Sequence, residues 1–184
     1  MALRVFSTAA LIALAACAVP ELEGGEPGPG ASSSPSRATA GLWPADRTRL
    51  IASSSGGGFA PPPPRGSTCT AGATTYEVDL AARTLAWTAC PDVGAATVLV
   101  VRGERALSGA AIAAIDSAMN DVGVAERAMC GADKPLLSLD VTSASQGTKR
   151  FADGFYSCLG GDAVYVDRVD AVFAALDALT VAAD

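Results

Sequence analysis

The sequence predicts an α+β fold for its C-terminal part, with an antiparallel sheet of about five strands and two helices packed on one face. Apolar and polar residues alternate in several short segments, which is typical of half-buried strands. In two longer segments apolar residues recur every three or four positions, which is typical of amphipathic helices. The expected order of elements is β-β-β-α-β-β-α, after a disordered N-terminal tether.

The first half of this domain is expected to contain three strands. Residues 76–80 alternate between apolar and acidic side chains, and residues 85–87 continue the pattern as the second arm of a hairpin. The apolar, β-branched segment 97–101 predicts a third strand, which the charged segment 102–105 ends.

A helix should follow this strand. Ser108 is a suitable N-cap residue, and apolar residues then recur at helical spacing as far as Val122. Gly123 stands where a helix commonly stops. These signals predict the first helix from residue 109 to residue 122.

The second half of the domain is expected to form another hairpin, a short strand and a second helix. Residues 137–141 alternate as a strand, and residues 151–158 return as its partner, with Gly154 at a bulge. A short strand at 164–166 then leads into an amphipathic helix over 169–179.

The chain begins with a segment that predicts export. Arg4 precedes an apolar run over 5–16, which is too short to span a membrane, since roughly 20 residues are needed. It fits a cleaved signal peptide. Its end, Leu14-Ala15-Ala16-Cys17, resembles the lipobox of bacterial lipoproteins. The resemblance implies cleavage before Cys17, a diacylglycerol on its sulfur and acylation, as with palmitate, of the new amino group. An ordinary signal peptide cleaved at a nearby small residue is the alternative.

Composition divides the rest of the chain in two. The expected organisation is a signal peptide over 1–16, the lipidated cysteine and a disordered linker over 17–67, and a disulfide-stapled domain over 68–184. The linker is rich in Pro, Gly and Ser, so it buries too little apolar surface to offset the entropy of ordering. An apolar island around Trp43 and Leu50 interrupts it, and docking on a partner or loose packing on the domain are both open.

The cysteine count agrees with export and lipidation. The chain has five cysteines, and lipidation of Cys17 leaves Cys69, Cys90, Cys130 and Cys158. Four cysteines suffice for two disulfides in an oxidising compartment. Of the three possible pairings we favour the sequential one, Cys69–Cys90 and Cys130–Cys158. No C-x-x-C motif is present, so neither a redox site nor a zinc site is indicated.

Composition also restricts the functional classes. The chain contains no histidine, which excludes a Ser/His/Asp triad, a Cys/His dyad and a His-ligated metal. Its net charge of −6 without a basic run argues against nucleic-acid binding. We expect no cofactor, no metal and no catalytic site, and interpret the acidic residues as a solvated surface. A carboxylate pair such as Asp133 with Asp153 is the enzymatic alternative.

A second resemblance is carried by several pieces of the stretch from Leu85 to Cys158. They are Trp87-Thr88-Ala89-Cys90-Pro91, the Ala-rich helix from Gly109, Met129-Cys130, Leu136 to Val141, Gln146-Gly147-Thr148-Lys149-Arg150 and Cys158. In this order they resemble the subtilisin-inhibitor family of secreted bacterial proteins. The resemblance implies a disulfide-braced protease-binding loop at Gly131, Ala132, Asp133, Lys134 and Pro135. The upstream position of Cys69 and the C-terminal helix depart from the family pattern.

The sequence therefore predicts an envelope lipoprotein that is held at the membrane by its lipid anchor. It would present a small binding or structural domain to an envelope protein partner. Ala18 is not the aspartate linked to inner-membrane retention, which implies the outer membrane if the host is Gram-negative. The alternative is a secreted or anchored protease inhibitor that uses the loop after Cys130.

Overall fold

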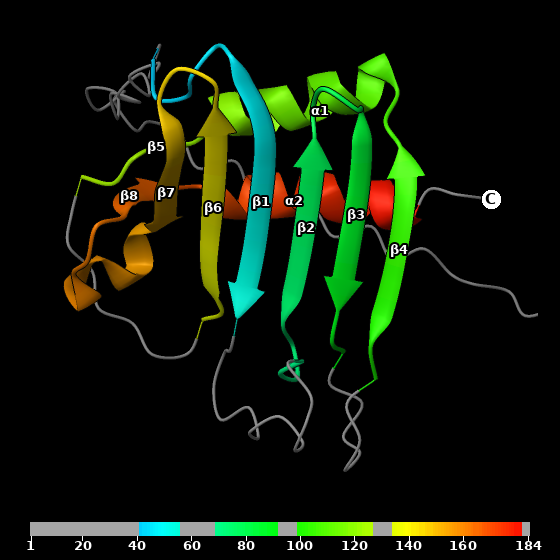
Figure 1. Cartoon of the computed structure of the whole chain (residues 1–184). Helices are drawn as coiled ribbons and strands as arrows, with labels where there is room; N and C mark the ends of the chain where they lie inside the picture. Colours follow the sequence, from blue (N-terminus) through cyan, green and yellow to red (C-terminus); the bar gives the residue numbers. More distant parts are fainter. Residues whose placement is uncertain (1–40, 56–68, 92–98, 127–133, 182–184) are drawn as a thin grey trace, which may run out of the picture. The chain divides into compact units, whose positions relative to one another are not determined.

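The computed structural model describes residues 41–55, 69–91, 99–126 and 134–181. In these residues an eight-stranded sheet carries two helices on one face (Figure 1). The α+β class and the pair of helices are thus confirmed. No helix in the described ranges is long and apolar enough to cross a bilayer.

The sheet is larger than predicted, and it is mixed. Its strand order is β4-β3-β2-β1-β6-β7-β8-β5. The bounds are β1 Arg47–Ser55, β2 Thr74–Asp79, β3 Thr84–Ala89, β4 Val101–Ala106, β5 Gly123–Val124, β6 Leu136–Ser143, β7 Gly147–Asp153 and β8 Val164–Asp167. Neighbours are antiparallel except β7 and β8, which run parallel. The expectation of about five antiparallel strands is therefore wrong in strand number and in this one direction.

Strand β1 lies in the segment that the sequence assigned to the linker. It pairs with β2 on one side and with β6 on the other, so it is a central strand. Leu50 and Ala52 are almost fully buried beneath the helices. Trp43, just before β1, packs against Phe151 and donates its indole N–H to the carbonyl of Met119 at 2.7 Å. The predicted domain boundary at residue 68 is wrong for residues 41–55, and the apolar island packs on the domain.

Both helices occur where the apolar spacing predicted them. Helix α1 spans Gly109–Asn120, and the Ser108 hydroxyl caps it by accepting the N–H of Ala111 at 3.1 Å. Helix α2 spans Val169–Val181 and turns a face of four side chains into the core, namely Val169, Val172, Phe173 and Leu176. The two helices contact each other and lie on the same face of the sheet (Figure 1).

Two predicted strands are placed differently in the structure. The third strand, β4, covers the charged segment that was expected to end it. Within it Gly103 lies against the ring of Trp87, where any Cβ would overlap the indole. The segment expected as one strand over 151–158 divides after Asp153. From there a 3₁₀ helix, η1, spans Gly154–Leu159, and the Asp153 carboxylate caps it by accepting the N–H of Phe155 at 3.0 Å.

One disulfide joins described residues. Cys69 and Cys90, which flank the β2–β3 hairpin, are bonded with their Cα atoms 5.8 Å apart, as in the pairing favoured from the sequence. Cys158 is also disulfide-bonded. Its bond to Cys130 stays a prediction, because Cys130 and Cys17 lie outside the described residues.

The buried position of β1 leads to a direct test. Leu50→Ala removes a side chain that is 1% exposed, and we expect it to lower the free energy of unfolding by about 2–5 kcal/mol. Ser55→Ala, at the exposed end of the same strand, should change it by less than about 0.5 kcal/mol. Denaturant unfolding of the two variants measures both effects. If neither variant changed the free energy of unfolding, β1 would not belong to the folded domain.

A second test uses the buried Tyr76, whose hydroxyl donates a hydrogen bond to the carboxylate of Asp177 on α2. Burial raises the pKa of this phenol above its usual value of 10, and the hydrogen bond and the charge of Asp177 act in the same direction. Because the folded-state pKa is the higher one, the stabilisation is complete below pH 10 and is lost as the pH rises above it.

Tyr76→Phe should therefore cost about 1 kcal/mol at pH 7 through the lost hydrogen bond. It should also weaken the decline in stability above pH 10. Tyr165→Phe is the matched control, since that hydroxyl bonds only the surface carbonyl of Gly160 at 2.6 Å. Urea unfolding at pH 7 and pH 11 measures both effects. An unchanged alkaline decline in Tyr76→Phe would show that this phenol is not responsible.

Candidate functional site

The binding loop predicted from the sequence is described only at its C-terminal end. Lys134 and Pro135 are exposed and lead directly into β6. Gly131, Ala132 and Asp133 lie outside the described residues. The geometry of the candidate site is therefore the geometry of this anchored end.

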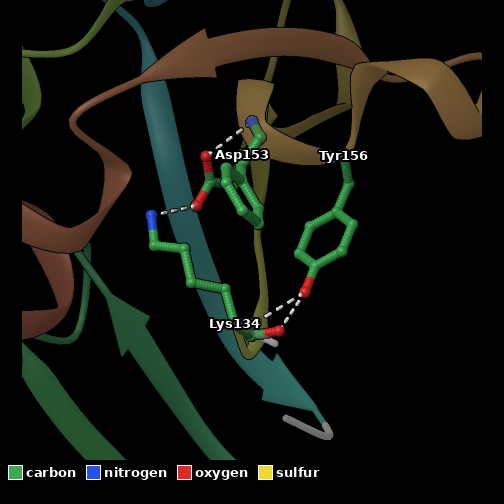
Figure 2. A network of polar contacts seen from close by, with 4 residues as sticks. Lys134, Asp153 and Tyr156 are labelled. Carbon is green, nitrogen blue, oxygen red and sulfur yellow. Dashed lines mark hydrogen bonds and ion pairs between the residues drawn. The ribbon is translucent and has the colours of Figure 1, made fainter. Parts of the chain in front are cut away.

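The backbone of Lys134 is held by a single side chain from η1. The hydroxyl of Tyr156 donates to the Lys134 carbonyl and accepts the Lys134 N–H at 3.2 Å (Figure 2). Tyr156 itself is buried, with 8% of its surface exposed. Since both polar backbone groups are satisfied by a rigid aromatic side chain, Lys134 loses little further entropy when a partner binds next to it.

The side chain of Lys134 turns back onto the domain. Its ammonium lies 3.2 Å from Oδ2 of Asp153 and 5.1 Å from the centroid of the Phe155 ring. Oδ1 of Asp153 accepts the N–H of Phe155, so both carboxylate oxygens have partners (Figure 2). These bonds compensate the burial of Asp153, whose side chain is only 9% exposed.

This arrangement limits what the predicted site residues can do. The ammonium of Lys134 would have to leave Asp153 before it could enter the pocket of a partner. Asp153 has a structural role as helix cap and ion-pair partner, and its proposed catalytic companion Asp133 lies outside the described residues. Among the described side chains no group of three or more His, Cys, Asp or Glu is placed to hold a metal ion.

The contribution of Tyr156 was missed by the sequence analysis. The sequence predicts one strand over 151–158, which gives no reason to connect Tyr156 with a residue 22 positions earlier. The only signal in the sequence was the Asp-Gly pair at 153–154, which favours a turn over a continuing strand. Gly154 packs so closely that a Cβ there would lie 2.6 Å from Cβ of Ala125.

No protein-family model, curated protein or solved structure matches the chain. The resemblances to lipoproteins and to subtilisin inhibitors thus stay predictions from short motifs.

Tyr156→Phe tests the anchor of the loop. The change removes one oxygen and leaves the N–H and the carbonyl of Lys134 without this partner, so we expect a loss of about 1–2 kcal/mol in stability. Hydrogen exchange at the Lys134 amide should accelerate. Tyr165→Phe, which removes a surface hydroxyl, is again the control and should leave that amide unchanged. Unaltered exchange in Tyr156→Phe would mean that the hydroxyl does not hold the loop.

Proposed function

We propose that the protein is a lipid-anchored component of the cell envelope that displays a non-catalytic binding domain. The observation that carries the proposal is the sequence Leu14-Ala15-Ala16-Cys17 at the end of an export signal. Several acyl chains on Cys17 would hold the chain firmly, because each buried CH₂ contributes about 0.8 kcal/mol. The outer membrane is the location if the host is Gram-negative.

The disulfide between Cys69 and Cys90 supports an exported location. Structural disulfides persist in oxidising compartments and are rare in the reducing cytosol. The bond closes the ends of the β2–β3 hairpin, and both cysteines are buried, which is typical of a structural bridge. A periplasmic or surface-exposed domain would retain it.

Binding is favoured over catalysis by the way the charged side chains are used. Asp153, the described acidic residue that contacts Lys134, serves the fold as helix cap and ion-pair partner. Elsewhere Arg47 pairs with Asp116 at 2.6 Å, which ties the start of β1 to α1. On the open face of the sheet, Arg150 makes two hydrogen bonds of 2.7 Å with Asp140.

Protease inhibition is the second candidate, and the hold of Tyr156 on Lys134 favours it. A loop that is rigid before binding costs less entropy to dock. Because the side chain of Lys134 is engaged with Asp153, contacts with a protease would come mainly from the residues that precede it. An inhibition assay with a subtilisin tests this candidate. Inhibition by the wild-type chain that is weaker in Tyr156→Phe would favour it over the first proposal.

The anchor is tested by the intact mass of the protein purified from its own membranes. We expect a chain that begins at Cys17 and carries acyl groups, and whose mass rises by about four hydrogens on reduction, two for each disulfide. Cys17→Ser is the control and should release the protein from the membrane fraction. A lipid-free wild-type mass, or membrane retention of Cys17→Ser, would contradict the proposal.

A further inference from the structure

The two edges of the sheet differ in how they are protected. Strand β5, at one edge, contains only two residues. Strand β4, at the other edge, pairs with β3 over six residues in an unbroken register, and no described strand pairs with its other side (Figure 1). Proteins usually protect an edge with a very short strand, charged side chains, a proline or a bulge. The β5 edge is protected by its shortness, whereas β4 has neither a proline nor a bulge and carries only charged side chains as protection.

The hydrogen-bonding direction of β4 follows from one bond. The N–H of Leu107 donates to the carbonyl of Arg83 at 2.7 Å, which identifies this as a hydrogen-bonded pair of the β3–β4 ladder. Hydrogen-bonded and non-hydrogen-bonded pairs alternate along an antiparallel ladder. The even-numbered residues Arg102 and Glu104 therefore direct their N–H and C=O groups away from the sheet, where a further strand would pair.

The side chains of Arg102 and Glu104 lie on the open face of the sheet and are exposed. On that face Arg49 pairs with Glu77 of the neighbouring strand at 2.5 Å. Among the described residues, by contrast, neither Arg102 nor Glu104 has an ion-pair partner. On this face, β4 thus carries one positive and one negative charge, two residues apart, that have no ion-pair partner among the described residues.

Exposed apolar side chains lead into the same edge. Leu99, Val100 and Val101 are 53%, 40% and 42% exposed. They stand directly before and at the start of β4, next to the unpaired backbone. A neighbouring strand would cover them together with the backbone groups.

We propose that β4 pairs antiparallel with β4 of a second copy of this chain, about a two-fold axis at Gly103. This register places Arg102 opposite Glu104 of the second copy, and the two-fold axis repeats the contact. Both residues are those whose backbone groups point outward, so each facing pair exchanges two N–H···O=C bonds. Each Arg102–Glu104 pair across the interface therefore combines opposite charges with two backbone hydrogen bonds.

Other self-pairing registers are less favourable. Centring the axis on Glu104 would oppose two glutamates, and centring it on Arg102 would oppose two arginines, with like charges directly across the ladder. The register about Gly103 avoids both arrangements. At the axis Gly103 faces its own copy in a non-hydrogen-bonded pair, where strands approach most closely and a residue without a side chain fits well.

The expected dimer is weak in solution. Six residues of edge bury less than the 1,200–2,000 Å² or so of stable interfaces, so we expect a dissociation constant in the micromolar range or above. This step rests on the proposed function: if lipid on Cys17 anchors the chain, confinement to a membrane would raise the effective concentration of one copy near another. The test in solution does not depend on that anchor.

The experiment uses the full chain with Cys17→Ser, so that lipid cannot cause association, and measures sedimentation velocity over a series of protein concentrations. Glu104→Arg opposes two positive side chains across the ladder, and Arg102→Glu opposes two negative ones. Each should raise the dissociation constant of the dimer about tenfold or more. The double variant restores opposite charges and should dimerise like the parent.

An equimolar mixture of the two single variants provides the sharpest test. One chain then carries two glutamates and the other two arginines at these positions, so heterodimers should form although neither variant pairs with itself. A fault in folding would not be corrected by mixing. The parent should also show amide exchange at Arg102 and Glu104 that slows as concentration rises.

A parent chain that stays monomeric at every concentration would overturn the proposal. So would single variants that associate as the parent does, or a mixture that fails to recover association. Membrane release of the Cys17→Ser chain concerns the proposed function alone, so the two proposals fail separately.

Discussion

The sheet depends on β1, because among the described strands this one alone joins its two halves. The β2-β3-β4 meander pairs with one side of β1, and β6 with its neighbours pairs with the other. Leu50 lies in register between Val78 and Val141, so a row of buried side chains runs across the join. Without β1 each half would expose a long edge as well as part of the core, and the helices would cover two separate surfaces.

β1 also shows where reasoning from the sequence reaches its limit. The helices were predictable because their apolar spacing is local and extends over three turns. In β1 only Leu50 and Ala52 are buried, and Ser-rich sequence follows them. Its pairing with β6 joins residues about 90 positions apart, so no local pattern reports it. Composition alone favoured a linker, and tertiary pairing overrode that preference.

The candidate site shows the same difference between what local sequence predicts and what long-range contacts determine. Its position next to β6 was predicted, but the residues that hold it were not. Asp153 and Tyr156 act on Lys134 from 19 and 22 residues away, across a chain direction that changes at η1. A reading of 151–158 as one strand could not place both side chains against the same residue. The structure shows that Lys134, the described end of the loop, is held by the hydroxyl of Tyr156 and the carboxylate of Asp153.

The two edges of the sheet differ, and this difference limits how many copies can associate by strand pairing. A sheet with two open edges would add copies at both and grow into a fibre. Here β5 offers only two residues, so pairing is confined to β4. Pairing of one edge with itself about a two-fold axis is isologous and leaves no second open edge for a third copy. In the proposed self-pairing Arg102 and Glu104 of the two copies complement each other, so the charges that would repel other strands favour a closed dimer over an open chain.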